Sequence, residues 1–86
     1  MKTITTLAAF AAFALSSAAL AAPVNINTAS AEEIATALNG IGPSKAQAIV
    51  EYREAYGEFS RADEIVFVRG IGTSTYESNK ADILVE

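Results

Sequence analysis

The sequence predicts a small all-α domain in which one helix–turn–helix unit is used twice. The pattern Gly-Ile-Gly, followed two positions later by serine, occupies residues 40–44 and recurs thirty positions later at residues 70–74. Ser30 and Ser60 precede the two copies, and each is followed three positions later by an acidic residue. That spacing is typical of a helix N-terminus. A repeat of about thirty residues in register indicates a tandem duplication inside one domain.

The first twenty-one residues have the layout of a secretory signal peptide. They hold one charge, Lys2, then an apolar run from Leu7 to Leu15 and small residues before a cleavage point after Ala21. The run is too short to span a bilayer, and it has no polar face of the kind a buried helix would show. The chain has no cysteine for a lipid or a disulfide. We therefore expect residues 22–86 to be released into the periplasm or the medium, without a membrane anchor.

The first repeat is expected to form two helices. An extended lead-in over residues 22–29 comes first, and Ser30 then caps a short helix over residues 32–38. The second helix follows the Gly-Ile-Gly turn and runs to about Tyr56, where Gly57 supplies the stop.

The second repeat begins after a connector whose aromatic residue, Phe59, is expected to anchor the two halves of the core. A third helix is predicted over residues 62–68, with a short extended segment over residues 65–68 as the alternative. The last helix is predicted from Ser74 to about Leu84. The internal repeat favours helix in both places.

Each Gly-Ile-Gly turn is suited to bind an anion. Glycine reaches backbone conformations that other residues avoid, and it places no Cβ in the way of a ligand. Pro43 fits the first position of the helix that follows. The turn then directs the amides of Gly42 and Ser44, with the positive end of the helix dipole, toward one point, where Lys45 adds a mobile charge. Phosphate is the anion that this arrangement suits.

The overall charge opposes strong binding to nucleic acid. Residues 22–86 hold five basic and ten acidic side chains, a net charge of minus five. Non-specific DNA affinity comes mostly from neutralised phosphates, so binding needs the few positive groups to converge. We expect low affinity with steep salt dependence.

Five segments together resemble the helix-hairpin-helix domain of the ComEA family of competence proteins. They are residues 24–29, 40–49, 52–53, 57–59 and 70–72. The resemblance covers almost all of the chain after the signal peptide. It implies a tandem helix-hairpin-helix, (HhH)2-like compact domain that acts as a periplasmic receptor for incoming double-stranded DNA during natural transformation, without sequence preference.

The resemblance also bears on cofactors and partners. It implies no cofactor beyond a monovalent cation that turn carbonyls of such hairpins can hold. Double-stranded DNA is the expected partner. Contacts with proteins of the DNA-uptake machinery and self-association of monomers along the duplex are left open.

The predicted DNA contacts lie in the two turns and the residues beside them. They are Gly40, Ile41, Gly42, Ser44, Lys45, Arg69, Gly70, Gly72, Thr73, Ser74 and Thr75. After the second turn the family tends to place a charged residue, whereas this chain has hydroxyl side chains. These can meet phosphate oxygens but neutralise no charge, so we expect the second turn to contribute less.

Several of these residues also have a plain structural interpretation. The turns can be helix connectors in which Ile41 and Ile71 fill the core. Arg53 and Lys80 are interpreted as ordinary solvated charges. Core or rim packing is the default for the tyrosines, which are Tyr52, Tyr56 and Tyr76.

Two other function classes are alternatives to DNA reception. An exported helix-hairpin-helix module for protein interaction or structure, without DNA binding, is the alternative that the negative charge favours. An enzyme such as a base-excision glycosylase is disfavoured, because the chain has no histidine or cysteine and no lysine placed with an acid for that chemistry. We expect no catalysis and no small-molecule substrate.

Overall fold

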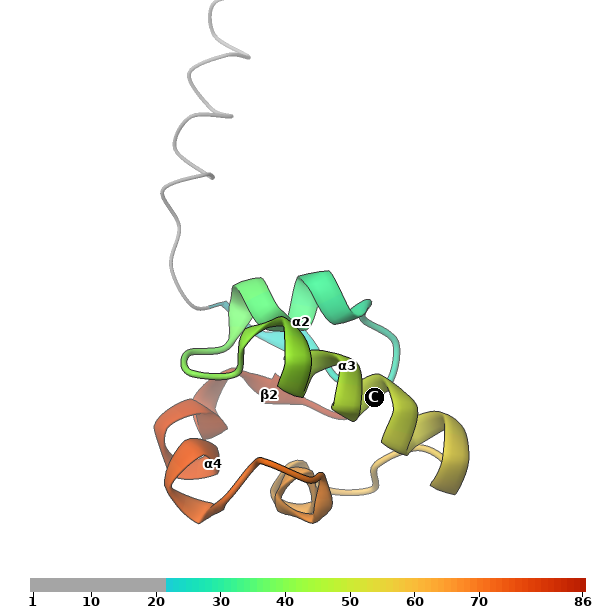
Figure 1. Ribbon diagram of the computed structural model, residues 1–86. Helices are drawn as coiled ribbons and strands as arrows, with labels where there is room; N and C mark the ends of the chain where they lie inside the picture. Colours follow the sequence, from blue (N-terminus) through green and yellow to red (C-terminus); the bar gives the residue numbers. More distant parts are fainter. Residues whose placement is uncertain (1–21) are drawn as a thin grey trace, which may run out of the picture.

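The computed structural model describes residues 22–86, so the predicted signal peptide lies outside the described part (Figure 1). The elements in chain order are β1 (Val24–Asn25), α2 (Ala31–Ala37), α3 (Gly42–Tyr56), the 3-10 helix η1 (Ala62–Phe67), α4 (Thr73–Asn79), the 3-10 helix η2 (Lys80–Asp82) and β2 (Ile83–Leu84). Helices carry the fold, which confirms the all-α prediction. Within residues 22–86 every helix falls short of the length and apolarity that a membrane span needs.

The first repeat forms as its sequence predicts. The Ser30 hydroxyl accepts a hydrogen bond from the Glu33 amide at 3.1 Å, and the Glu33 carboxylate accepts one from the Ser30 amide at 2.9 Å. This reciprocal capping box fixes the start of α2. α3 ends at Tyr56, and Gly57 adopts a φ of 97°, a left-handed conformation that favours glycine at a helix end.

The second repeat starts differently from the expected pattern. η1 is a 3-10 helix, not the α-helix expected over residues 62–68, and its N-cap is Arg61. The helix begins at Ala62 as predicted, but its N-cap is Arg61 and not Ser60, and the acid that reaches back to the Ser60 amide is Glu64, at 2.9 Å. Asp63, the predicted capping acid, instead pairs with Arg61 at 3.0 Å.

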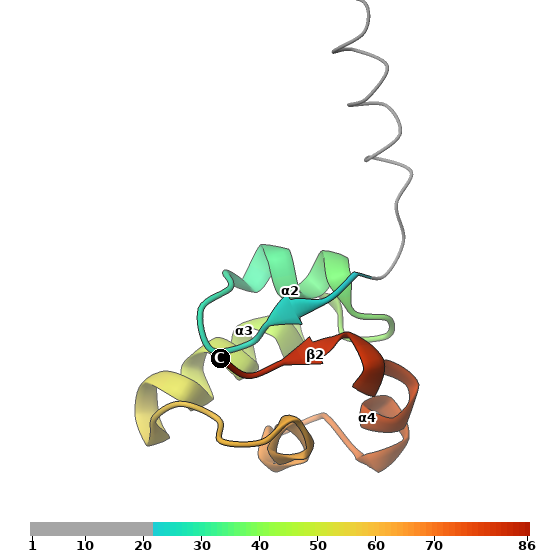
Figure 2. The same ribbon diagram turned by 180° about the vertical axis from the view of Figure 1, so that it is seen from behind.

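The prediction of a last helix reaching Leu84 is wrong. α4 stops at Asn79, and Ile83–Leu84 forms β2, parallel to β1, with Val24 opposite Ile83. The Ile26 amide also donates to the Leu84 carbonyl at 3.0 Å. Figure 2 shows the two short strands side by side at the back of the molecule. The lead-in has backbone N–H and C=O groups without partners of their own. Their hydrogen bonds to residues 83–84 stabilise the fold more than a further turn of helix would.

One core joins the two repeats. Ile41 and Ile71, the central residues of the two turns, are 3% and 4% exposed. Phe59 is buried as predicted, and its ring stacks on Tyr52 with centroids 5.3 Å apart. Asn27 holds the Phe59 backbone, donating to its carbonyl at 3.0 Å and accepting from its amide at 2.7 Å. The connector is therefore held both by packing of the Phe59 ring and by hydrogen bonds to the Phe59 backbone.

Arg53 is part of this framework and is not the solvated charge that was predicted. It is half-buried, and its Nη1 donates to the carbonyls of Ile26 and Ala29 at 2.8 and 2.7 Å. Packing α3 against the segment before α2 places those carbonyls within reach of the guanidinium. Arg53 thereby ties α3 to the lead-in.

We predict that Arg53→Ala lowers the free energy of unfolding by about 2 kcal/mol, because it removes two hydrogen bonds from a charged donor to part-buried carbonyls. Arg61→Ala is the matched control, since it removes the same charge from an exposed ion pair and should cost less than about 1 kcal/mol. Urea unfolding of the purified proteins measures both. Equal losses would contradict the structural role of Arg53.

Candidate nucleic-acid interface

The first turn has the backbone that the sequence predicts. Gly40 and Gly42 have φ values of 76° and 70°, in the region that favours glycine. A Cβ placed on either residue would meet nothing within 4 Å. Glycine is therefore required by the backbone conformation and not by crowding, and the turn lies open to solvent. The side chain of Ile41 is buried in the core, so the contact predicted for this residue remains available only to its backbone.

The second turn repeats only part of this geometry. Gly70 is left-handed, with a φ of 91°, but Gly72 is extended, with a φ of −107°, and is the N-cap of α4. Thr73 and Ser74 at the start of α4 are exposed, and Thr75 is half-buried. The two turns are thus similar in sequence and different in backbone at their second glycine.

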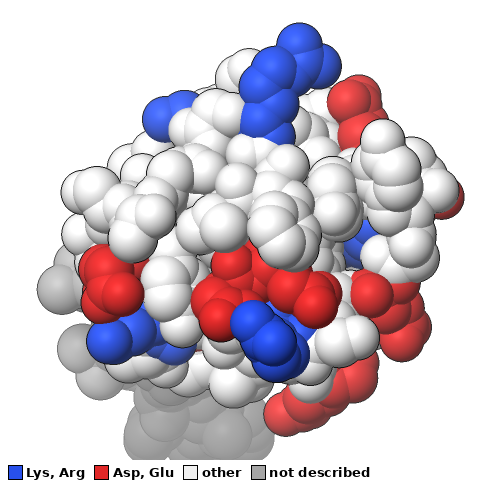
Figure 3. Space-filling view, turned by 90° about the horizontal axis from the view of Figure 1, so that it is seen from below, with Lys and Arg blue, Asp and Glu red and all other residues white. Residues whose placement is uncertain are grey.

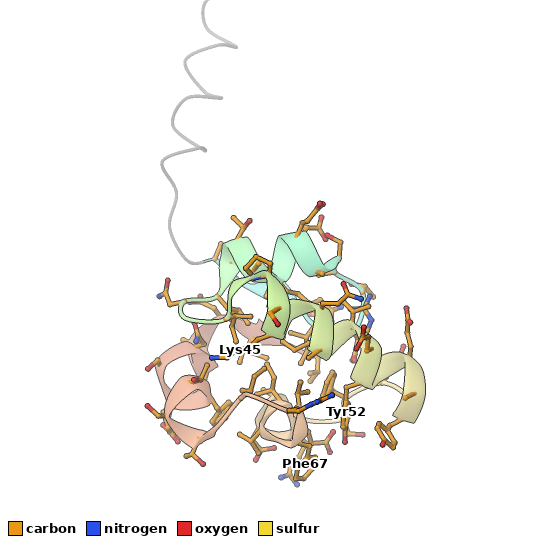
Figure 4. All side chains as sticks on the ribbon, viewed as in Figure 1. Lys45, Tyr52 and Phe67 are labelled. Atoms are coloured by element: carbon orange, nitrogen blue, oxygen red, sulfur yellow. The ribbon has the colours of Figure 1, made fainter. Side chains whose placement is uncertain are left out.

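The two turns meet where Lys45 crosses Gly70. A Cβ on Gly70 would lie 3.6 Å from both Cγ and Cε of Lys45, so the lysine stem lies along the second turn. Lys45 projects from α3 between the two halves of the molecule (Figure 4). Contact between α3 and the second turn places a positive charge from the first repeat beside a turn of the second.

A groove of about 550 Å³ surrounds this contact, and we call it the hairpin groove. It is lined by Ser44, Lys45, Gln47, Ala48, Glu51, Arg69 and Gly70. Four of the predicted contacts, two from each repeat, therefore share one concave surface. The other predicted contacts do not line it. They are Gly40, Ile41, Gly42, Gly72, Thr73, Ser74 and Thr75.

Glu51 also lines the hairpin groove, and the sequence analysis missed it. It lies six residues after Lys45 on α3, and its carboxylate accepts a 3.4 Å hydrogen bond from Gln47. Helical spacing was the signal that could have found it, because Glu51 lies four residues after Gln47 and three after Ala48 on the same face of α3. Figure 3 shows Lys and Arg side chains in separate groups with acidic side chains between some of them, so this face has no continuous positive surface.

Asn79 holds the first turn in place and was also missed. Its side chain is 1% exposed. Its Oδ1 accepts from the Asn39 amide at 2.8 Å, and its Nδ2 donates to the carbonyls of Asn39 and Thr75, both at 2.9 Å. We call this set of hydrogen bonds the Asn79 bridge. It connects α4 to the residue before Gly40, forty positions away, and no local sequence pattern signals it.

Lys80 behaves as an exposed surface charge, as predicted. Its ammonium pairs with Glu77 at 3.0 Å, and that hydrogen bond raises the pKa of Lys80 above its ordinary value. It does not line the hairpin groove. The monovalent cation expected on the turn carbonyls stays a prediction.

Comparison with known proteins identifies a family whose members share this sequence pattern. A family model described as a helix-hairpin-helix motif matches residues 21–84. The chain is 51% identical over 61 residues to a Haemophilus influenzae protein described as uncharacterized, covering 71% of this chain and 54% of that protein. It is 48% identical over 63 residues to ComE operon protein 1 of Bacillus subtilis, covering 73% of this chain and 30% of that protein.

A third relative carries a different name. The human endonuclease/exonuclease/phosphatase family domain-containing protein 1 is 42% identical over 62 residues, covering 72% of this chain and only 11% of that protein. This chain therefore spans about half of the Haemophilus protein and smaller shares of the other two relatives.

We predict that Asn79→Ala lowers the free energy of unfolding by about 3 kcal/mol, because the Asn39 amide and carbonyl lose their partner. The exposed neighbour Ser78→Ala, which loses one solvent-exposed hydrogen bond, should change it by less than about 1 kcal/mol. Hydrogen exchange adds a local readout, since the Asn39 amide should exchange faster in Asn79→Ala. An unchanged rate at Asn39 would contradict the Asn79 bridge.

Proposed function

We propose that this chain, which belongs to the helix-hairpin-helix motif family and is ComEA-like, binds double-stranded DNA without sequence preference. The observation that carries the proposal is the hairpin groove, where Ser44 and Lys45 of one repeat meet Arg69 and Gly70 of the other. Two cations, one from each repeat, converge on this surface, and such convergence is what phosphate binding requires in a protein whose net charge is negative.

The groups in and beside the hairpin groove suit phosphate contact better than base reading. Lys45 and Arg69 neutralise phosphates, while backbone amides of the open first turn and the Ser44 hydroxyl donate hydrogen bonds to phosphate oxygens. The exposed hydroxyls of Thr73 and Ser74 supply further donors at the start of α4. Contacts of this kind position a duplex and carry no sequence information. The proposed activity is binding, with no catalytic step.

We further propose that the protein receives DNA in the periplasm during natural transformation. One relative is named ComE operon protein 1, and the first twenty-one residues have the layout of a cleaved signal peptide. Non-specific binding by this protein in the periplasm would hold the incoming DNA there and prevent its return to the outside of the cell. Proteins of the uptake machinery, and further copies of this chain along the duplex, are the proposed partners.

A protein-interaction module is the alternative that one observation favours. Glu51 lines the hairpin groove, and residues 22–86 have a net charge of minus five. Both features repel phosphate and attract a basic protein surface. The DNA titration described next separates the two functions, because the module requires no DNA affinity at low salt.

The first test is a titration of the purified protein with a labelled random-sequence duplex from low to physiological salt. We expect binding with a log–log salt slope of about −2 to −4. Lys45→Gln should weaken binding about five- to tenfold and reduce the slope by about 1, because it removes one phosphate contact. Lys80→Gln is the matched control and should leave affinity within about twofold, since that charge is already paired. No binding at low salt would refute DNA reception.

A second prediction concerns the acid in the hairpin groove. Glu51→Gln should raise duplex affinity about three- to fivefold, because it removes a negative charge beside the proposed phosphate site. Glu54→Gln removes the same charge from an exposed position of α3 outside the hairpin groove, so a smaller gain is expected. The same titration measures both variants. Equal gains would show that only net charge matters and that the hairpin groove is not the site.

The third prediction tests export. The full chain, expressed in a bacterium with two membranes, should appear in the periplasmic fraction with Ala22 as its first residue, because small side chains precede that bond. N-terminal sequencing of the fractionated protein checks both points. Recovery of the uncleaved chain in the cytoplasm would contradict the proposed location.

A further inference from the structure

Two aromatic rings project from the surface beside the hairpin groove. Tyr56, the last residue of α3, is 76% exposed, and Phe67, the last residue of η1, is 65% exposed. The core does not use either ring, and neither ring belongs to the proposed duplex site. Both line one groove of about 330 Å³, which we call the aromatic groove. Its volume lies near the lower end of the range of about 300–1,000 Å³ for small-ligand sites, so it suits flat rings and not a duplex.

The aromatic groove has two walls and a supported ring. α3 contributes Ala48, Tyr52 and Ala55 to one wall, and η1 contributes Phe67 to the other, as Figure 4 shows for the labelled Tyr52 and Phe67. Tyr52 is stacked on the buried Phe59, and the Tyr56 ring lies 4.7 Å from Tyr52. The supported Tyr56 ring presents an open face without a large loss of side-chain entropy on binding. The two alanines leave room between the walls.

Arg69 joins the aromatic groove to the hairpin groove, because it lines both. A path therefore leads from Lys45 past Arg69 to the two exposed rings. Single-stranded nucleic acid is recognised by this combination, with cations along the backbone and ring faces on which bases stack. Glu51 lines both grooves as well, so phosphates are expected on the Arg69 side of the path.

We propose that the aromatic groove binds unpaired nucleobases of a DNA strand whose phosphates lie at Arg69 and the hairpin groove. This proposal rests on the proposed DNA-binding function and extends it from the duplex to single-stranded ends and overhangs. Charge continuity favours this occupant over an apolar peptide, because Arg69 supplies a phosphate partner at the mouth of the aromatic groove. Stacking on ring faces needs no base-specific hydrogen bond, so it keeps binding independent of sequence.

The test compares two probes that share one duplex, the first blunt and the second with a thymidine overhang of about eight nucleotides. The purified protein should bind the overhang probe about tenfold more tightly than the blunt one. The double variant Tyr56→Ala with Phe67→Ala should lose this preference and keep its affinity for the blunt probe. The ring-preserving double variant Tyr56→Phe with Phe67→Tyr should keep the preference, which separates stacking from any effect on folding.

Tyrosine emission gives a direct readout, because the chain has three tyrosines and no tryptophan. The overhang probe should quench this emission more than the blunt probe does, and Tyr56→Phe should remove the additional quenching.

Four outcomes would overturn the inference or the proposed function. Equal affinity for the two probes, or an overhang preference that survives loss of both rings, overturns the inference and leaves duplex binding intact. Binding of neither probe overturns both proposals. Binding of the overhang probe alone, with loss of that binding in the double alanine variant, supports the aromatic groove and contradicts duplex reception.

Discussion

The Asn79 bridge is the interaction on which the relative placement of the two turns depends. Asn79 satisfies both the amide and the carbonyl of Asn39, so the first turn is held by the last α-helix of the second repeat. Asn27 does the same for the backbone of Phe59, and Arg53 binds two carbonyls of the lead-in. A domain of this size buries only about 60% of its unfolded surface. Polar side chains that bind loop backbones therefore stabilise this small domain in the way that disulfides stabilise small secreted domains.

The sequence predicted the features that depend on local pattern. The repeated Gly-Ile-Gly turns, the Ser30 cap, the end of α3 at Gly57 and the burial of Phe59 all follow from residue types and spacing. α2 begins one residue before its predicted start, and the N-cap of η1 is Arg61, although Ser60 has the same spacing to an acid as Ser30. Local pattern therefore predicts the presence of each turn and helix better than it predicts the residue at which each one begins.

Most of the features that the sequence did not predict are long-range. Arg53 and Asn79 look like surface residues until α3 and α4 are packed against loops 24 to 40 positions away. The β1–β2 pair joins segments at opposite ends of the described residues, and although the lead-in was predicted to be extended, its pairing with residues 83–84 was not predicted. The contact between Lys45 and Gly70 is also long-range, because it forms only when the two repeats pack against each other. The candidate residues were predictable one by one, but their grouping into a single groove was not.

We propose that this acidic protein binds DNA through local convergence of positive charge. Lys45 and Arg69 share the hairpin groove, Glu51 weakens it, and Arg69 extends it toward the exposed rings of Tyr56 and Phe67. The most direct measurement is a nuclear magnetic resonance titration of the backbone amides with a random-sequence duplex. We expect the largest shift changes at the amides of residues 40–42, 44–45 and 69–75. Changes confined to the exposed faces of α2 and to the β1–β2 edge would contradict it.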